Sequence, residues 1–384
     1  MKIVGIELIP VKVPYVKPIP IHVGINKEAN NLIVIINTDE GEYGLGEVSP
    51  LIPSYSGETQ ETAIYTIYKT LGPNLIGKDP TNIESIWNLM DNLLLGHTCA
   101  KSGLDIALHD LKAKSMGIPV YNLFGEKLRG KLPILWTISW GGGNRGMIDD
   151  AVKYLKKGYR HLKVKIGSKK IEDDVERVKA IREVSGEIPL IADANQAYSV
   201  DEAIKIINAL KNYIEVLEQP LPRWDILGYK YLTENSEIPI MVDESVPTPQ
   251  EAMNFAQLGA CKLFLIKLMR SGGFFPTRKI VEIAKKFKIG CIACSMTELG
   301  IGTAANAHFA CSTEYLIDRF GFGFDGPLQI FGITESKGFD MDIVEVPPKY
   351  KNGNLYVPKG PGLGVELHEE NIEKYRSGKT RKLS

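Results

Sequence analysis

The fold of this chain is decided by five short stretches: HLKVKI (161–166), PLIAD (189–193), IEVLE (214–218), IPIMVD (238–243) and CKLFLIK (261–267). Each stretch is a run of mainly apolar and β-branched residues with a charged residue at or near its end. The intervals that separate Lys165, Asp193, Glu218, Asp243 and Lys267 are 28, 25, 25 and 24 residues. Each interval has room for about one strand and one helix. The stretches therefore predict an α/β fold with a parallel sheet.

The charged strand ends indicate a barrel with a functional site at its mouth. A charge at the end of a buried strand is costly unless it is paired or bound to a metal. In a barrel of parallel strands the carboxyl-terminal strand ends meet at one face, where active sites collect. We therefore expect three acids (Asp193, Glu218, Asp243) and several lysines to converge there.

Composition bounds the remaining possibilities. The chain has 384 residues, more than one compact barrel needs, and a formal net charge of zero. Without a basic tract, neither nucleic acid nor an anionic membrane surface is expected as a partner. The amino-terminal residues lack the features of a secretion signal, and no run approaches the 18 apolar residues of a spanning helix. The five cysteines show no disulfide framework, which favours a cytoplasmic location.

The first 125 residues lack the strand–helix rhythm and predict a separate α+β capping domain. Strands are expected at 31–37 and 43–48, and helices at 58–71, 80–95 and 98–116. The barrel is expected to occupy residues 126–325, with its first strand at 133–140 and its last at 317–324. Residues 326–384, with a short strand at 354–358, are expected to fold back onto the capping domain.

The residue types at the strand ends predict a metal-assisted proton transfer. Three carboxylates without histidine or cysteine suit Mg²⁺, or Mn²⁺, rather than zinc. The negative charge of a substrate carboxylate bound there would be neutralised by the metal. The carbon next to that carboxylate would then become easier to deprotonate. Desolvation, the metal and a second ammonium, Lys163, are expected to depress the pKa of Lys165 and make it a base. Lys267 is expected across the mouth, where it meets the opposite face of the same carbon.

With these residues in place, the chain resembles the enolase superfamily, in the muconate lactonizing enzyme subgroup of the mandelate racemase/muconate lactonizing enzyme family. The resemblance covers nearly the whole chain. It is carried by Lys163-Val164-Lys165, Asp193-Ala194-Asn195, Glu218-Gln219-Pro220, Asp243-Glu244-Ser245, Lys267, Leu104 to Leu111 and Glu298.

The resemblance implies a (β/α)7β TIM-like barrel under a capping domain, with Mg²⁺ held by Asp193, Glu218 and Asp243. It implies Lys165 and Lys267 as the acid/base pair, with Lys163 tuning Lys165 and helping to bind the substrate carboxylate. Further candidate substrate contacts are Asn195, Glu298 and Asp325. Cap loops at 16–30 and 49–56 are expected to close over the substrate.

One departure from the family pattern bears on the substrate. Members that epimerise dipeptides usually carry two aspartates flanking one residue at the last barrel strand, to hold the substrate ammonium. This chain reads Gly323-Phe324-Asp325 there, which makes a dipeptide less favoured. Trp136 to Ser139, in contrast, resembles the matching segment of muconate-type cycloisomerases.

Several functions stay open at this point. The leading one is an isomerase, that is, a racemase, an epimerase or a cycloisomerase, acting on a small-molecule carboxylate. The near alternative is a dehydratase that uses the same proton abstraction for β-elimination. A Schiff-base aldolase with Lys267 as nucleophile needs no metal, and a barrel that only binds a ligand needs neither lysine. Association into a homo-oligomer is expected, His308 is expected to be packed in the core, and Cys291 and Cys294 are expected to serve packing.

Overall fold

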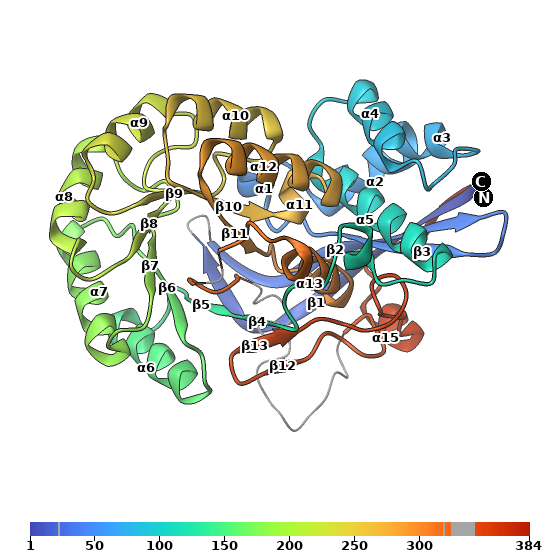
Figure 1. Ribbon diagram of the computed structural model, residues 1–384. Helices are drawn as coiled ribbons and strands as arrows, with labels where there is room; N and C mark the ends of the chain where they lie inside the picture. The colour runs from blue at the N-terminus through green and yellow to red at the C-terminus, as the bar shows by residue number, and fades with distance from the viewer. Residues whose placement is uncertain (22–23, 318, 324–341) are drawn as a thin grey trace.

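The computed structural model describes residues 1–21, 24–317, 319–323 and 342–384, with only the backbone described between 16 and 26. It has a curved parallel sheet ringed by helices and a second unit in which helices pack on an antiparallel sheet (Figure 1). No helix among the described residues is both long and apolar enough to cross a membrane. The boundaries proposed at residues 125 and 325 stay predictions.

The parallel sheet has the strand order β11-β10-β9-β8-β7-β6-β5, so every strand lies beside its neighbour in the chain. All six pairings between these strands are parallel. This order confirms the barrel alternation expected from the charge spacing. The strands are β5 (Leu135–Ile138), β6 (His161–Lys165), β7 (Leu190–Asp193), β8 (Val216–Glu218), β9 (Ile240–Val242), β10 (Leu263–Lys267) and β11 (Gly290–Cys294).

The segment that ends at Gly323 closes this sheet into a ring. Phe322 forms a parallel bridge with Ile134, next to β5, and Gly323 forms one with Cys294 at the end of β11. Five backbone hydrogen bonds of 2.7–3.0 Å accompany the closure, including Phe322 N to Pro133 O. The last strand was predicted at 317–324; the described part of that segment makes strand-like bridges, whereas residues 318 and 324 lie outside the described residues.

The strands are connected by helices on the outside of the ring (Figure 1). Ser199 caps the third of them, since it accepts the Glu202 N–H while Glu202 accepts the Ser199 N–H. Thr248 caps the fifth, α10, by accepting the Glu251 N–H on its side chain. The helices are α6 (Gly143–Lys156), α7 (Ile171–Ser185), α8 (Val200–Leu210), α9 (Ile226–Asn235), α10 (Pro249–Leu258), α11 (Leu268–Ser271), α12 (Phe274–Phe287) and α13 (Gly300–Ser312).

The amino-terminal unit is a four-stranded antiparallel sheet of order β14-β1-β2-β3 covered by helices. Its strands are β1 (Ile3–Ile21), β2 (Gly24–Thr38), β3 (Tyr43–Val48) and β14 (Arg381–Leu383). Its helical segments are α1 (Pro53–Ser56), α2 (Gln60–Tyr65), the π-helix η1 (Thr66–Leu71), α3 (Gly72–Leu75), α4 (Ile83–Leu93), α5 (Thr98–Ser115) and the 3-10 turn η2 (Val120–Leu123). The predicted hairpin and three helical regions are therefore found.

One expectation for this unit is wrong. Residues 16–30 were expected to form a cap loop, but all except 22 and 23, which are not described, lie in β1 and β2. The two strands pair antiparallel from Ile3 opposite Thr38 to Ile21 opposite Gly24. The ladder shifts its register between Pro14 and Ile19 and then continues to the end of β1. A strand tolerates proline at an edge or at such an irregularity, where the missing N–H removes no ladder hydrogen bond.

Close packing of helix on sheet explains the glycines of the Gly44-Leu45-Gly46 sequence. A Cβ on Gly44 would overlap the carbonyl oxygen of Ala107, and one on Gly46 would overlap that of Gly103. Because both carbonyls belong to α5, the helix backbone lies directly on β3. The pair of glycines therefore fixes α5, the helix of the Leu104 to Leu111 motif, against the cap sheet.

The described part of the carboxyl-terminal segment reaches the sheet of the amino-terminal unit. β14 pairs antiparallel with β1, with Ile6 opposite Leu383. A small sheet of order β12-β13-β4 joins β12 (Tyr350–Lys351) and β13 (Asn354–Tyr356) to β4 (Lys131–Pro133), which leads into the barrel. The helix α15 (Glu369–Tyr375) precedes β14 and contacts β1.

Candidate active site

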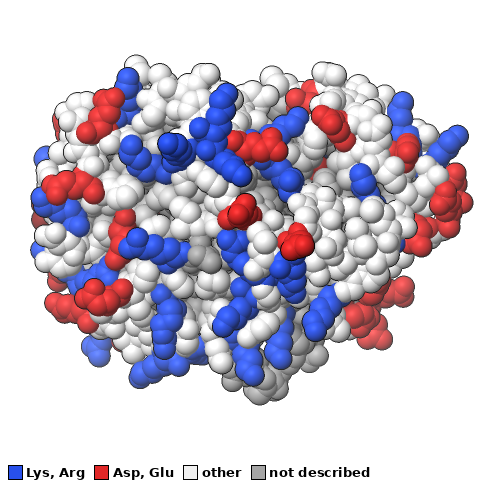
Figure 2. Space-filling model, viewed as in Figure 1, with Lys and Arg blue, Asp and Glu red and all other residues white. Residues whose placement is uncertain are grey.

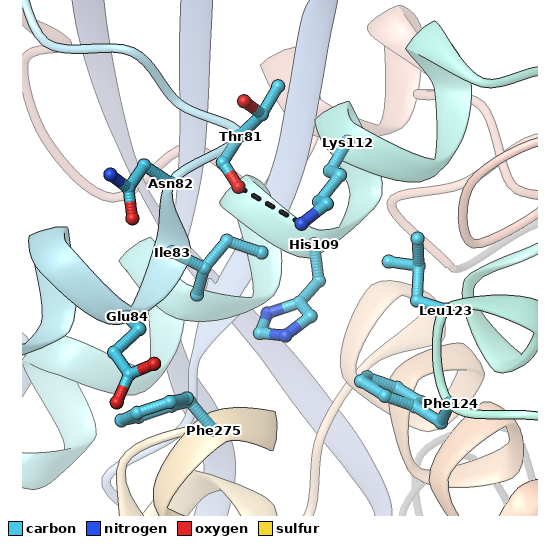
Figure 3. A pocket seen from close by; sticks show the side chains of 9 residues that line it. All are labelled: Thr81, Asn82, Ile83, Glu84, His109, Lys112, Leu123, Phe124 and Phe275. Carbon is cyan, nitrogen blue, oxygen red and sulfur yellow. Dashed lines mark hydrogen bonds between the residues drawn. The ribbon is translucent and has the colours of Figure 1, made fainter.

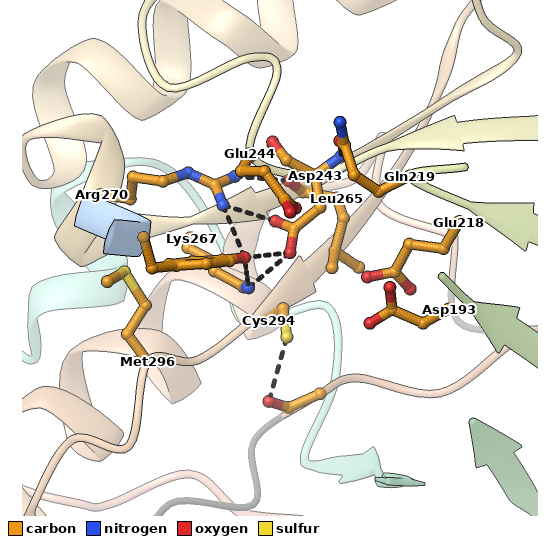
Figure 4. A network of polar contacts seen from close by, with 12 residues as sticks. Asp193, Glu218, Gln219, Asp243, Glu244, Leu265, Lys267, Arg270, Cys294 and Met296 are labelled. Atoms are coloured by element: carbon orange, nitrogen blue, oxygen red, sulfur yellow. Dashed lines mark hydrogen bonds and ion pairs between the residues drawn. The ribbon is translucent and has the colours of Figure 1, made fainter. Parts of the chain in front are cut away.

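The predicted charges lie at the same end of neighbouring strands. Lys165 is the Cα partner of Asp193, and Asp193 is that of Glu218, so the ends of β6, β7 and β8 are level. Asp243 follows β9 directly, and Lys267 is the last residue of β10. The parallel register therefore brings the predicted residues together at the barrel mouth (Figure 4).

Two lysines on β6 pair with the acids of the next two strands. Lys163 Nζ lies 3.1 Å from Glu218 Oε1 and 3.7 Å from Asp193 Oδ2. Lys165 Nζ lies 2.5 Å from Asp193 Oδ2 and donates to Asn195 Oδ1 at the same distance. Asn195, predicted as a substrate contact, therefore also orients the Lys165 ammonium in this structure.

A second cluster surrounds Asp243. Lys267 Nζ lies 2.7 Å from Asp243 Oδ2, and Arg270 Nη1 lies 2.6 Å from Oδ1. Arg270 also donates to the Asp243 carbonyl oxygen at 2.6 Å. The Tyr55 hydroxyl donates to Asp243 Oδ2 and accepts from Lys267 Nζ at 2.5 Å. Asp243 is thus held by two cations and a phenol.

The capping unit supplies Tyr55 to this cluster. α1 places the tyrosine ring 4.6 Å below Lys267 Nζ, close enough for a cation–π contact. Ser49 Oγ donates to the Met296 carbonyl oxygen, just after β11, at 2.6 Å. Residues 49–56, expected to close over the mouth, therefore reach it from the cap.

Sequence reasoning did not assign Arg270 and Tyr55 to the site. Arg270 stands three residues after Lys267, and the turn of α11 is what returns its guanidinium to Asp243. Tyr55 lies 188 residues from Asp243 in the sequence, and only the docking of the cap joins them. A signal for Arg270 existed in its nearness to Lys267, and Tyr55 lies in the loop 49–56 that was expected over the mouth, but nothing in the sequence indicated its contact with Asp243.

Gln219 links two of the strand ends. Its Oε1 accepts the Asp243 N–H at 2.8 Å, and its Nε2 donates to Ser245 Oγ and to the Tyr229 hydroxyl, both at 2.7 Å. It adopts a positive φ of 42°, which non-glycine residues take only where the surroundings demand it. The fully buried amide therefore fixes where Asp243 stands relative to Glu218.

The acids differ in their electrostatic surroundings. Burial, followed by the charge of Asp193, raises the pKa of Glu218 to about 8. Burial also acts to raise the pKa of Asp193, but Lys165 and Lys163 outweigh it and lower that pKa. Arg270 and Lys267 outweigh burial in the same way and hold the pKa of Asp243 well below its usual range.

The protein's own groups do not depress the pKa of Lys165. Burial lowers the pKa of Lys165, and the positive charge of Lys163 lowers it further, but Asp193 outweighs both and raises it. The pKa of Lys163 is raised well above its usual value, because Glu218 and other acids outweigh its burial. The sequence argument counted the second ammonium and left out the carboxylates that neutralise it.

The donor set fits a hard divalent cation, although no metal cage is preformed. Glu218 is fully buried, and its Oε2 atom has no hydrogen-bond partner among the described residues. Such an orphaned carboxylate oxygen is costly unless something binds it. In the described part of the chain, however, no three His, Cys, Asp or Glu side chains form a group that could hold a metal ion. The three acids are turned towards lysines and an arginine instead.

Glu298 and Asp325 were also predicted to contact the substrate. Glu298 is fully buried beside the start of α13, where its Oε2 accepts the Met296 N–H at 2.7 Å. None of its hydrogen bonds reaches the strand-end lysines, so its role as a substrate contact stays a prediction. Asp325 lies outside the described residues.

A cavity of about 350 Å³ lies away from the barrel mouth, between α4, α5 and α12 (Figure 3). It contains none of the predicted site residues. His109, which points into it, donates from Nδ1 to the Asp105 carbonyl oxygen at 2.8 Å. The Asp105 carboxylate in turn accepts the Phe274 N–H at the start of α12. This pair therefore anchors a barrel helix to the cap.

The packing expectations for cysteine and histidine are confirmed. All five cysteines are free and buried. His308 is fully buried in α13, where Nε2 lies 3.0 Å from the Leu363 carbonyl oxygen and Nδ1 accepts the Tyr121 N–H.

A capped barrel with lysines and acids on successive strand ends defines a class of barrel enzymes with a charged site at the barrel mouth. Comparison with known proteins identifies the family. Residues 4–125 match the mandelate racemase/muconate lactonizing enzyme amino-terminal domain, and residues 146–371 match the enolase carboxyl-terminal domain-like family. The chain belongs to the mandelate racemase/muconate lactonizing enzyme family of the enolase superfamily, and it is an isomerase of that superfamily.

Relatives with different reactions are similarly close. The chain is 33% identical over 369 residues to the L-Ala-D/L-Glu epimerase of Bacillus subtilis, covering 95% of this chain and 97% of that enzyme. It is 31% identical to muconate cycloisomerase 1 of Rhodococcus opacus, covering 97% and 98%. The crystal structure of N-succinyl Arg/Lys racemase from Bacillus cereus superposes with a TM-score of 0.92 at 30% identity over the whole of both chains.

Proposed function

We propose that this isomerase is a racemase or epimerase that removes and returns the proton next to a substrate carboxylate. The main support for this proposal is the position of two lysines in the ring of strands. β6 and β10 are the second and sixth members of a ring of eight when the closing segment is counted, so Lys165 and Lys267 come from opposite sides. Removal of a proton from one face and delivery to the other inverts the carbon.

Asp193, Glu218 and Asp243 would hold a divalent cation, with Mg²⁺ favoured and Mn²⁺ also accepted. Three oxygen donors without nitrogen or sulfur are the ligands that hard cations prefer. The buried Oε2 of Glu218, which has no hydrogen-bond partner among the residues that the structure describes, supports this assignment. When bound, the cation would neutralise the substrate carboxylate and the extra negative charge that builds up on it after proton loss.

The chain's own residues supply the remaining steps. Lys165, oriented by Asn195, takes or delivers the proton on one face, and Lys267 does so on the other. Lys163 stays an ammonium that attracts the substrate carboxylate. Arg270 fixes Asp243 by two hydrogen bonds, and Tyr55 covers the mouth and excludes water. Cycloisomerisation needs only one of these proton transfers, so it remains the alternative outcome.

The experiment is hydrogen exchange in heavy water with N-acyl amino acids, dipeptides and muconate. The wild-type enzyme should place deuterium on the carbon next to the carboxylate. Lys165→Ala and Lys267→Ala should each lose racemisation, and each should keep exchange with only one enantiomer. Lys262→Ala, at an exposed lysine just before β10, serves as the matched control and should behave as wild type.

Metal dependence is tested in the same assay. EDTA should abolish exchange, and Mg²⁺ should restore it. Full activity in EDTA, or covalent trapping of Lys267 by borohydride, would instead favour the metal-free aldolase. Exchange that survives both lysine substitutions would remove the acid/base assignment.

A further inference from the structure

The cavity of about 350 Å³ between α4, α5 and α12 has the build of a ligand site (Figure 3). Ligand pockets commonly measure roughly 300–1,000 Å³ and combine apolar walls with a few convergent polar groups. This cavity lies at the small end of that range. Its ionisable side chains are His109 and Lys112 of α5 and Glu84 of α4. Size and lining therefore suit a small molecule that is both apolar and charged.

The apolar walls of the cavity are held in place by cations that lie outside it. Phe124 and Phe275 supply two aromatic walls, and Leu123 adds aliphatic surface. The Arg278 guanidinium lies 4.6 Å from the centroid of the Phe124 ring, and Lys279 Nζ lies 4.2 Å from that of Phe275. Both distances are those of cation–π contacts. Because neither cation lines the cavity, both rings are fixed from behind and can pack against an apolar group inside.

His109 presents an acceptor to the cavity. The side chain is only 4% exposed, and its ring lies among the lining residues in Figure 3. Nδ1 donates to the Asp105 carbonyl oxygen at 2.8 Å, so Nε2 is the acceptor of the neutral ring. Nε2 makes no hydrogen bond with any residue that the structure describes. A ligand that supplies an N–H group at this point would satisfy it.

Lys112 and Glu84 bring opposite charges to the same cavity. Lys112 Nζ donates to the Thr81 carbonyl oxygen at 3.1 Å, which occupies one of its three protons. Glu84, in the first turn of α4, makes no hydrogen bond or ion pair within the described ranges of the chain. Figure 3 shows the two side chains apart from each other in the lining. A ligand can therefore meet an ammonium at one place and a carboxylate at another.

We propose that this cavity binds a free α-amino acid with an apolar or aromatic side chain. The carboxylate of the ligand pairs with Lys112, and its ammonium donates to Glu84 and to Nε2 of His109. The side chain packs between the aromatic walls. A simple anion would leave Glu84 and His109 without a donor, and a simple amine would leave Lys112 without an acceptor. None of these residues lies at the barrel mouth, so the site stands apart from the proposed proton transfer.

Calorimetric titration of the whole protein in EDTA tests the ligand class. The probes are L-phenylalanine and L-leucine, each with two analogues that lack one charge: phenylpropanoate and phenylethylamine for the first, isocaproate and isoamylamine for the second. At least one amino acid should bind saturably, and its analogues should bind at least about tenfold more weakly, because each loses a hydrogen-bonded charge. No saturable binding of either amino acid, or an analogue that binds as tightly, would overturn the proposal.

Substitutions in the cavity assign each charge to its partner. Glu84→Gln should weaken amino-acid binding by about tenfold and leave the carboxylate analogue unchanged, since that analogue has no ammonium. Lys112→Met should weaken the amino acid by a similar factor and leave the amine analogue unchanged. Asp201→Asn, at the same second position of α8, and Lys262→Met are exposed controls and should bind as wild type. Equal weakening of amino acid and analogue in a cavity variant would contradict direct contact.

Two further variants locate the ligand. Leu123→Trp should fill the cavity and abolish binding, with Tm reporting that the variant is folded. Lys165→Ala, at the barrel mouth, should bind the amino acid as the wild-type protein does. Binding that survives Leu123→Trp but disappears in Lys165→Ala would place the amino acid at the barrel mouth and overturn the proposal.

Discussion

At the scale of single residues, Glu218 is the acid whose state depends most on what the site holds. It is fully buried, one oxygen pairs with Lys163, and the other has no partner in the described part of the chain. Burial raises its pKa to about 8, so Glu218 is protonated more readily in the folded protein than in the unfolded chain. The neighbouring Asp193 and Asp243 are held ionised by cations. The three acids therefore start from unequal states before any ligand arrives.

This imbalance leads to a prediction about Mg²⁺ and stability. A ligand that binds only the folded state stabilises it by mass action, by about 2.7 kcal/mol at 100 times its Kd. Mg²⁺ should therefore raise the Tm of the wild-type protein in a concentration-dependent manner. Glu218→Gln should abolish most of this rise, because the amide is a weaker ligand for a hard cation.

Calorimetry or a thermal-shift measurement checks this without any substrate. Glu237→Gln is the matched control, at an exposed glutamate near the other end of β9, and should keep the full rise. An unchanged Mg²⁺ response in Glu218→Gln would remove Glu218 from the ligand set.

At the scale of elements, α13 shows how the cap and the barrel complete each other. Its first turn donates the Leu299 and Gly302 N–H groups to Glu47 of β3, at 2.7 and 2.8 Å. A carboxylate at a helix amino terminus satisfies donors that the helix itself leaves free. The cap for this barrel helix thus comes from another unit, 252 residues away in the sequence.

His308, which lies in the same helix, should make the stability of the protein depend on pH. Its Nδ1 accepts the Tyr121 N–H and leaves no place for a second proton, and burial lowers its pKa to about 4 from 6.5. Because the unfolded chain binds the proton more tightly, stability is complete above pH 6.5 and falls as the pH drops towards 4. The loss approaches about 3 kcal/mol over that window.

Urea unfolding between pH 4 and 7 measures this loss. His308→Gln keeps an acceptor and a donor but does not titrate, so its free energy of unfolding should fall less steeply on acidification. The difference between the two proteins isolates His308 from the carboxylates that titrate in the same range. Parallel curves for the two proteins would contradict the prediction.

At the scale of the whole molecule, the cap and the barrel share many buried contacts. The Tyr15 hydroxyl donates to Thr297 Oγ1 at 3.1 Å, and the Phe274 N–H donates to Asp105 Oδ2 at 2.5 Å. Charge on the face shown in Figure 2 is mixed, with basic and acidic side chains spread over both units. The predicted homo-oligomer stays a prediction.

These shared contacts predict that the two units unfold together. Trp87 lies in the cap and Trp136 in the barrel, and both are buried. Variants that keep only one of these tryptophans, with the others changed to phenylalanine, should show the same urea midpoint and slope. Two separate transitions would show that the cap unfolds on its own.

The barrel and the ring of charges could be predicted because both follow from short-range patterns. Apolar runs that end in a charge every 24 to 28 residues leave few alternatives to parallel strands with a common mouth. The ribbon formed by β1 and β2 was missed because Pro14, Pro18 and Pro20 read as breaks in a strand. The structure accommodates these prolines at the edge of the strand and at a register shift. Neither feature can be read from the sequence.

The electrostatic state of the site could not be predicted to the same extent. The pairing of Lys165 with Asp193 depends on distances between strands, and it reverses the expected direction of the pKa shift. Tyr55 enters only because the cap docks on the barrel. Contacts of this kind arise from tertiary packing, and a single sequence carries little signal for them.

The pairing of β14 with β1 has a consequence for how the protein is made. Residues 381–383 leave the ribosome after every strand of the barrel, whereas β1 is among the first segments to emerge. During synthesis the outer edge of β1 therefore waits with unpaired backbone groups, which invite pairing with other nascent chains. That edge stays open until the last strand arrives and pairs with it.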